Sequence, residues 1–313
     1  MFRPARMLRR WTAIVRRRAV VSMLLLSLPG HGIGPDLQLE SQLPNVAAHS
    51  PAARAAKRLD DASPADRARV DATLAAAGPD ERPYLIEALA AGHSAEDVVT
   101  FARLIRGKRP EWLRTHLSLI DPDGPGRVTY RGSPVRQADD TACGPMTILM
   151  ARAMTDPLYA LNFTTTGSAD PSDASVAQFQ ARLTAEEHRI HDATNRFWPE
   201  RLGSTPAGVG NELNRHADAL GARYEPHVVT GIGGKSGLRD AVDAADSAQP
   251  VPVLIGDRIP RHYILLIGRD AADLLVYDPA RARVSRISEQ SFLDGKLDAL
   301  RFRHVFAVIT PSP

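Results

Sequence analysis

The chain has 313 residues, of which 43% are hydrophobic and 24% charged, so it is long enough to bury one large core or two small ones. The formal charge of +3 comes from the N-terminus: residues 1–18 hold seven arginines and no acid, which leaves 32 basic against 36 acidic residues in 19–313. The slight acidic excess of this body excludes a broad phosphate-binding surface, so we expect no nucleic-acid partner, and the single cysteine excludes an intramolecular disulfide.

The N-terminus has the layout of an export signal. The basic residues 1–18 precede the apolar run 19–28, which Pro29 and Gly30 end. This run is too short to cross a bilayer as a helix, whereas a basic start followed by an apolar core of about 7–15 residues is typical of a secretory signal. We therefore expect a leader and linker over residues 1–50 and export or membrane association, with a cytoplasmic location as the alternative.

Residues 51–122 are expected to form a small helical region. Ser63 and Pro64 are typical of a helix start, with a capping hydroxyl followed by a proline in the first turn. Ser94 begins another helix, whose apolar residues recur at i, i+3, i+4 and i+7 over 98–105. No chemical motif is present, so we expect a structural subdomain, with a prosegment or a substrate-docking cap as alternatives.

The pattern changes after a cluster of turn-forming residues at 121–126. The apolar run 144–154 predicts a buried helix, and further helices are expected at 176–197 and 206–219. Strand-like runs follow, so the sequence predicts an α+β domain over 123–313, in which an apolar helix packs on an antiparallel sheet. These runs are 223–229, 251–255, 263–267, 274–277, 283–287 and 304–309.

Cys143 stands at the start of the apolar helix, where Thr141 is expected to cap and Pro145 suits the first turn. The free N–H groups and the dipole of such a helix start stabilise a thiolate and lower the pKa of a thiol. We expect the Cys143 N–H and the Gln137 side chain to donate to an oxyanion, and Gly144 to let a substrate approach closely. The alternative for any single cysteine is an inert core residue.

A histidine and an aspartate are expected to complete the site. His262 opens a strand, residues 268–272 turn the chain, and a second strand runs back to Asp278. If the two strands pair symmetrically about residue 270, His262 faces Asp278 directly, with Cβ atoms about 4.5–5.5 Å apart. The carboxylate then orients the imidazole and stabilises its charged form, while the imidazole serves as base to Cys143.

This pattern resembles the papain-like cysteine peptidase superfamily: Gln-x5-Cys-Gly-Pro, a histidine that opens a strand, and a strand that ends in Tyr-Asp-Pro. More narrowly, residues 127–310 are similar to the peptidase domains that cut bacteriocin leaders after a double glycine, and to their stand-alone bacterial relatives. The resemblance implies a papain-like fold with Cys143 as nucleophile, His262 as base, Asp278 as orienting acid and Gln137 as oxyanion donor. The segment 156–205 is longer than a minimal domain of this kind needs.

The resulting prediction is a cysteine peptidase that cleaves peptide or amide bonds through an acyl-enzyme, needs no cofactor and acts on a peptide or protein. We expect Gly144 and Asp140 to contact the substrate, although Asp139 and Asp140 fit a solvent-facing role equally well. An acyltransferase, transglutaminase or deamidase would use the same machinery, because pocket shape selects the acceptor. A non-catalytic binding module that keeps the fold is the third alternative.

Two further patterns favour other chemistry less well. Residues 229–236 are similar to a phosphate-binding loop, but Val229 stands where that motif needs glycine, so a glycine-rich turn is expected. His188 and His191 lie three residues apart with Glu187 beside them, as in some metal sites. A solvated polar helix face is the preferred interpretation, with no metal.

Overall fold

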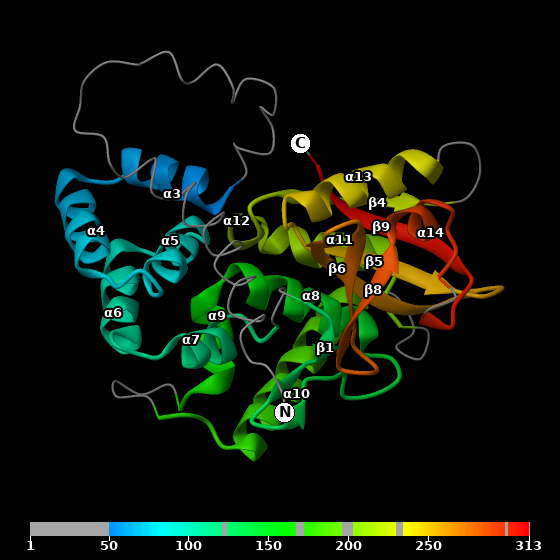
Figure 1. Ribbon diagram of the computed structural model, residues 1–313, viewed down its shortest axis with the longest axis horizontal. Helices are drawn as coiled ribbons and strands as arrows, with labels where there is room; N and C mark the ends of the chain where they lie inside the picture. The colour runs from blue at the N-terminus through cyan, green and yellow to red at the C-terminus, as the bar shows by residue number, and fades with distance from the viewer. Residues whose placement is uncertain are drawn as a thin grey trace, which may run out of the picture. The chain divides into compact units, whose positions relative to one another are not determined.

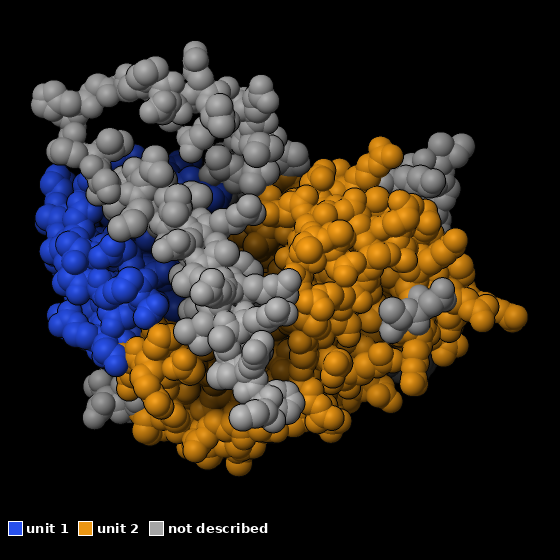
Figure 2. All heavy atoms as spheres, in the orientation of Figure 1, with its two compact units in different colours: residues 1–107 blue, residues 108–313 orange. Residues whose placement is uncertain are grey.

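The computed structural model describes residues 50–120, 124–166, 172–195, 203–229, 234–297 and 300–312. The expected export signal and the centre of the glycine-rich turn at 229–236 lie outside the described residues. Among the helices that are described, none is both long and apolar enough to cross a membrane. Contacts divide the chain into two compact units, 1–107 and 108–313, which Figure 2 shows in different colours.

The first unit is helical in its described part. The predicted helix starts at Ser63 and Ser94 are confirmed, because their side chains accept hydrogen bonds from the N–H groups of Asp66 and Asp97. Asp97 also accepts from the Ser94 N–H, which completes a capping box. The first of the four helices packs against the third, and the second against the fourth. They are α3 (Pro51–Asp60), α4 (Pro64–Ala76), α5 (Arg82–Ala90) and α6 (Ala95–Ile105).

The next helix, α7 (Pro110–Leu117), belongs to the second unit, where it packs against α9 (Pro157–Thr164). The sequence had placed α7 in a helical region that ends at residue 122. The packing of α7 on α9 places the division of the two compact units before α7 rather than at the turn cluster that follows it, and Leu113 and Leu117 are buried on the helix.

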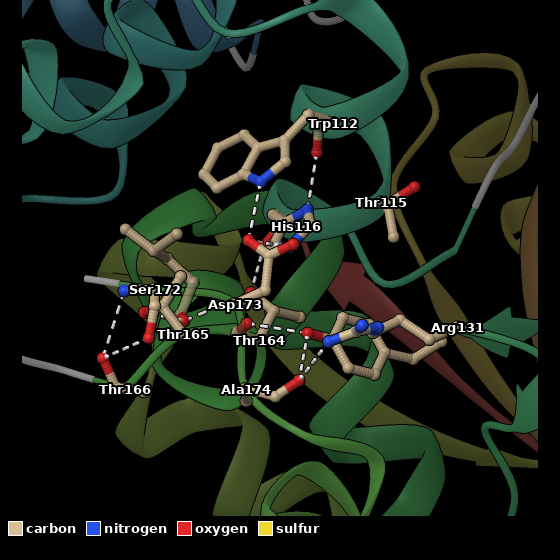
Figure 3. Close-up of polar contacts among 12 residues, drawn as sticks. Trp112, Thr115, His116, Arg131, Thr164, Thr165, Thr166, Ser172, Asp173 and Ala174 are labelled. Carbon is tan, nitrogen blue, oxygen red and sulfur yellow. Dashed lines mark hydrogen bonds and ion pairs between the residues drawn. The ribbon is translucent and has the colours of Figure 1, made fainter.

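Polar contacts reinforce this attachment of α7 (Figure 3). The indole N–H of Trp112 donates to Asp173 Oδ1 at 2.9 Å, and the His116 Nδ1 donates to the Trp112 carbonyl at 2.9 Å. The His116 and Trp112 rings stack with centroids 4.0 Å apart, and His116 Nε2 lies 3.2 Å from Asp173 Oδ1. α7 is therefore tied to the segment that follows α9, because Asp173 lies 61 residues after Trp112.

The second unit has the predicted α+β class, which is confirmed. Its apolar helix comes first and an antiparallel sheet dominates the end of the chain. The predicted helix over 206–219 is divided at His216. α8 (Cys143–Thr155) precedes α9. The helices that follow α9 are α10 (Val176–Thr194), α11 (Pro206–Arg215), α12 (Ala217–Leu220), α13 (Gly234–Asp246) and α14 (Glu289–Leu293).

Nine strands form two sheets in the described part of the chain, and every pairing in them is antiparallel. The strands are β1 (Gly126–Arg127), β2 (Thr129–Tyr130), β3 (Ser133–Pro134), β4 (Arg223–Val228), β5 (Val251–Gly256), β6 (Pro260–Asp270), β7 (Asp273–Asp278), β8 (Arg283–Ser288) and β9 (His304–Ser312). The larger sheet has the order β1-β8-β7-β6-β5-β9-β4, and β2 pairs with β3 in the smaller one.

The larger sheet separates two apolar cores, with α8 on one face and α13 on the other (Figure 1). The strand β6 contributes to both, because successive side chains of a strand point to opposite faces. Tyr263 and Leu265 belong to the core with α8, whereas Ile264 and Leu266 belong to the core with α13. Both faces are covered, so β6 is apolar at consecutive positions rather than at alternate ones.

The hairpin between β6 and β7 has a different register from the predicted one. Leu265 pairs with Tyr277, and the strands continue to the pair Asp270 and Asp273, which leaves a two-residue loop. The prediction took Gly268 as the start of the turn. Instead, Gly268 has φ 150° and lies at a bulge inside the strand, so the centre of the hairpin moves past residue 270.

Gly208 and Gly210 on α11 provide a matched test of packing. A Cβ added to Gly208 would lie 2.5 Å from the Thr194 carbonyl oxygen, whereas the nearest atom to a Cβ on Gly210 is Pro226 Cδ at 3.5 Å. We expect Gly208→Ala to lower the free energy of unfolding by about 1–3 kcal/mol through overpacking. Gly210→Ala should be neutral or stabilising by up to about 1 kcal/mol through helix propensity. Denaturant unfolding of both variants measures the difference, and equal stabilities would contradict the packing at α11.

Candidate active site

Cys143 is the first residue of α8 and is 5% exposed. The N-cap is Ala142, and no side chain in the described part of the chain caps the helix. The expected cap by Thr141 is therefore wrong: its hydroxyl and its N–H both donate to Asp139 Oδ1 at 2.7 Å instead. The positive end of α8 is left to act on the sulfur and on an anion beside it.

His262 and Asp278 meet as predicted, although not as directly opposed residues. The observed register, continued by one pair, places Asp278 opposite Ile264, so His262 lies diagonally across the two strands. Diagonal neighbours on one face remain within reach of long or aromatic side chains. His262 Nε2 lies 2.9 Å from Asp278 Oδ1, and the two residues are only 8% and 4% exposed.

The Cys143 side chain also lies close enough to the imidazole of His262 to raise the pKa of the ring. Because Nε2 is held by Asp278, Nδ1 is the ring nitrogen that remains for the thiol. Burial lowers the pKa of His262, but the hydrogen bonds to Asp278 and Cys143 and the charges of both groups outweigh it and raise the pKa to about 9. Phe302 stacks on the ring with centroids 5.8 Å apart, which helps to fix its plane.

Asp278 is kept ionised by its surroundings. Burial would raise the pKa of the carboxyl, but the hydrogen bond from His262 and the charges of His262 and Arg281 lower it. The Ala280 N–H donates to Oδ1 at 3.0 Å, and Arg281 Nε lies 3.4 Å from Oδ2. The turn after β7 thus supplies a second donor and a cation, which keep the carboxylate facing the imidazole.

Gln137 lies beside the end of β7, because its backbone N–H donates to the Pro279 carbonyl at 3.1 Å. Its side-chain Nε2 donates to the Asp139 carbonyl at 2.6 Å, which occupies one of the two amide hydrogens. Gln137 Oε1 is buried and has no partner among the described residues. The oxyanion role of Gln137 stays a prediction.

The two predicted substrate contacts lie in different surroundings. Gly144 is buried, and a Cβ added to it would lie 3.0 Å from Ser204 Cβ and 3.4 Å from Tyr263 Cδ2. Packing against these two side chains is therefore a reason for glycine that the sequence did not reveal. Asp140 is exposed. Contact of either residue with a substrate stays a prediction.

The expected solvated face on α10 is wrong for two of its three residues. His188 is exposed, but Glu187 is 0% exposed and His191 is 8% exposed. Glu187 Oε2 accepts a hydrogen bond from the Ala138 N–H at 2.9 Å, so α10 reaches the segment just before Cys143. In the part of the chain that the structure describes, no group of three or more potential metal ligands is found.

A sequence signal for the burial of Glu187 was present. The residue continues the buried stripe of α10, at spacings of four and three from its apolar neighbours Leu183 and Ile190. A charged residue in the middle of an apolar stripe is expected to be buried together with its apolar neighbours. Here the stripe packs against α8 and α11. The extra segment 156–205 therefore contributes a side chain to the surroundings of the site.

The contact between His262 and Asp278 can be tested by titration. Asp278→Asn should lower the pKa of His262 from about 9 towards its ordinary value of 6.5, because the ring loses its charged acceptor. An NMR titration of the His262 ring in the wild type and the variant measures this change. Asp140→Asn, which alters an exposed acid, serves as the control. An unchanged His262 titration in Asp278→Asn would contradict the observed pairing.

No protein-family model matches the chain, and no curated protein does. Among solved structures, the chain is similar to the peptidase domain of Streptococcus ComA, a bi-functional ABC transporter involved in a quorum-sensing pathway. It has 17% sequence identity to this chain and a TM-score of 0.31, and the match covers 57% of this chain and 98% of that one. The function proposed below therefore rests on the geometry of this chain's own residues.

Proposed function

We propose that the chain is a papain-like cysteine peptidase, which hydrolyses peptide or amide bonds through an acyl-enzyme on Cys143. One observation carries the proposal: a single imidazole, that of His262, is hydrogen-bonded to the Asp278 carboxylate and has its pKa raised by the neighbouring Cys143 side chain. A nucleophile, a base and a group that orients the base, each within hydrogen-bond reach of the next, are what nucleophilic catalysis requires. The position of Cys143 at the start of α8 adds the helix dipole to the stabilisation of a thiolate.

The first half of the reaction forms the acyl-enzyme. With the proton of Cys143 on His262 Nδ1, the thiolate attacks the substrate carbonyl carbon, and the electrons of the C=O bond move to oxygen. The backbone N–H of Cys143 and the second amide hydrogen of Gln137 donate to this oxyanion. As the C–O double bond reforms, the C–N bond breaks, and Nδ1 gives its proton to the leaving amine.

The second half releases the product. His262, now neutral, takes a proton from water. The resulting hydroxide oxygen bonds to the carbonyl carbon of the thioester, and the C–S bond breaks. The sulfur leaves as the thiolate and the imidazolium is restored. Asp278 accepts the Nε2 hydrogen throughout, so the ring keeps one tautomer and one orientation in both halves.

Alkylation tests whether the sulfur is accessible and activated. Because Cys143 is the only cysteine, every alkylated site reports on it. At pH 6.5 iodoacetamide should label the wild type at least about 10-fold faster than His262→Ala, since the imidazolium stabilises the thiolate. His188→Ala, which removes an exposed histidine, should label like the wild type. Equal rates in wild type and His262→Ala would favour a non-catalytic module.

Turnover separates the remaining functions. Cys143→Ala should abolish hydrolysis of a peptide mixture, and His262→Ala should reduce it by about 10²–10⁴-fold, with a smaller loss in Asp278→Asn. Mass spectrometry of the products, with and without an added primary amine, identifies the acceptor. Products in which the added amine is joined to the acyl group would show that the reaction is acyl transfer rather than hydrolysis. Thermal unfolding is the control, because a matched loss of folding in both alanine variants would indicate structural roles.

A further inference from the structure

α10 carries a row of buried polar side chains that the mechanism above does not use. Glu187, His191 and Asn195 follow each other at i, i+4 and i+8, so they lie on one side of the helix, and Asn195 is its C-terminal cap residue. They are 0%, 8% and 8% exposed. Each has a buried side-chain atom without a partner among the described residues: Glu187 Oε1, His191 Nε2, and both Oδ1 and Nδ2 of Asn195. Buried polar groups are normally paired, so this row needs an explanation.

Glu187 is the member of this row that touches the candidate site. Its Oε2 accepts from the Ala138 N–H, in the middle of the segment 137–139. On one side of Ala138 stands Gln137, whose Oε1 is also buried and without a partner in the described chain. On the other side stands Asp139, whose carboxylate holds Thr141 at the entrance to α8. Glu187 therefore anchors the segment that carries the proposed oxyanion donor.

The surroundings of Glu187 favour its neutral form. Burial and, to a smaller extent, the negative charge of Asp139 raise the pKa of Glu187, whereas the hydrogen bond from the Ala138 N–H lowers it. The net effect is a pKa of about 8. From β7, Tyr277 faces the same region, and its own pKa is raised by burial and by the charge of Glu187. From α10 itself, His191 and His188 act on Asp139 rather than on Glu187. No salt bridge to Glu187 is found in the described residues.

Ionisable groups on the other helices packed against α10 are engaged with one another or with Glu186 and Arg189 of α10. On α8, the Arg152 guanidinium lies over the Tyr159 ring of α9, and the Tyr159 hydroxyl donates to Glu186 at 2.9 Å. On α11, Glu212 lies 3.6 Å from Arg189. None of these groups is among those that act on Glu187. A neutral acid is thus the form that this site stabilises at neutral pH.

We propose that Glu187 is a positioning residue for the proposed peptidase: as a neutral acid it accepts the Ala138 N–H with one oxygen and donates its own proton to Gln137 Oε1 with the other. A protonated carboxyl has one O–H donor, and Gln137 Oε1 is a buried acceptor that lacks one. With Oε1 fixed, the two amide hydrogens of Gln137 are directed away from α10. One reaches the Asp139 carbonyl and the other is left for the oxyanion. This role rests on the proposed function.

Activity variants test the role through Gln137. Glu187→Gln keeps an acceptor for Ala138 and a donor for Gln137, so kcat/KM at pH 7 should stay within about 3-fold of the wild type. Glu187→Ala should lose about 10–100-fold, less than the about 10²–10³-fold expected for removal of an oxyanion donor. In a Gln137→Ala background, Glu187→Ala should cost almost nothing more. Additive losses would overturn the role, as would equal losses in Glu187→Gln and Glu187→Ala.

The pH profile adds a readout that a merely structural role would not change. As the pH rises through about 8, Glu187 loses the proton that it donates, so kcat/KM of the wild type should fall there. In Glu187→Gln this fall should move up towards the pKa of His262, about 9. Asp192→Asn, which changes an exposed acid on the same helix, should leave the profile unchanged. A wild-type profile identical to that of Glu187→Gln would overturn the proposal.

A measurement without turnover separates this proposal from the proposed function. The ¹⁵N side-chain amide signal of Gln137, assigned by its loss in Gln137→Ala, should shift with an apparent pKa near 8 in the wild type and stay constant in Glu187→Gln. If the Gln137 signal titrates in a protein that hydrolyses no peptide, the proposed peptidase function is overturned and the contact between Glu187 and Gln137 is supported. A Gln137 signal that does not titrate, in an active enzyme, would overturn the contact alone.

Discussion

The candidate site depends on the imidazole of His262, which is held between a carboxylate and a thiol. Burial by itself favours a neutral ring, because charge is costly to remove from water. Here the hydrogen bonds and charges of Asp278 and Cys143 reverse that preference, so that the pKa of His262 rises to about 9. The carboxylate of Asp278, whose own pKa is lowered, is the anion that this imidazolium accompanies. The pairing with Asp278 also determines that Nδ1 is the nitrogen that serves the sulfur.

The sheet makes this arrangement rigid. β6 is hydrogen-bonded to β5 on one side and to β7 on the other, and apolar cores cover both of its faces. A slip of one residue would turn every β6 side chain to the opposite core and would take His262 away from Asp278. α8 is buried along most of its length between this sheet and helices α10 and α11, and a helix that is apolar all round suits such a position. The sulfur and the ring therefore meet through two elements that are each fixed by packing.

α10 shows how a segment outside the three chemical motifs takes part in the site. Its apolar stripe packs against α8 and α11, and that packing takes Glu187 out of solvent. A buried acid that is hydrogen-bonded to the backbone just before Cys143 is costly to keep unless it makes a defined contact. The polar row on α10 is thus packed together with the helix that begins at Cys143, rather than forming an independent surface.

The sequence by itself predicted the α+β class, the apolar helix with Cys143 at its start, and the proximity of His262 and Asp278, because these follow from periodicity and from local turn and strand signals. Only the tertiary structure decided the register of the hairpin and which of two conflicting signals on α10, an apolar stripe or a polar face, held for Glu187. A bulge at Gly268 moves the centre of the hairpin, and no local pattern shows whether a glycine starts a turn or sits in a bulged strand. The face that α10 buries is likewise decided by its packing against α8 and α11, and so Glu187 and His191, which were expected to face solvent, are part of the interior while His188 is exposed.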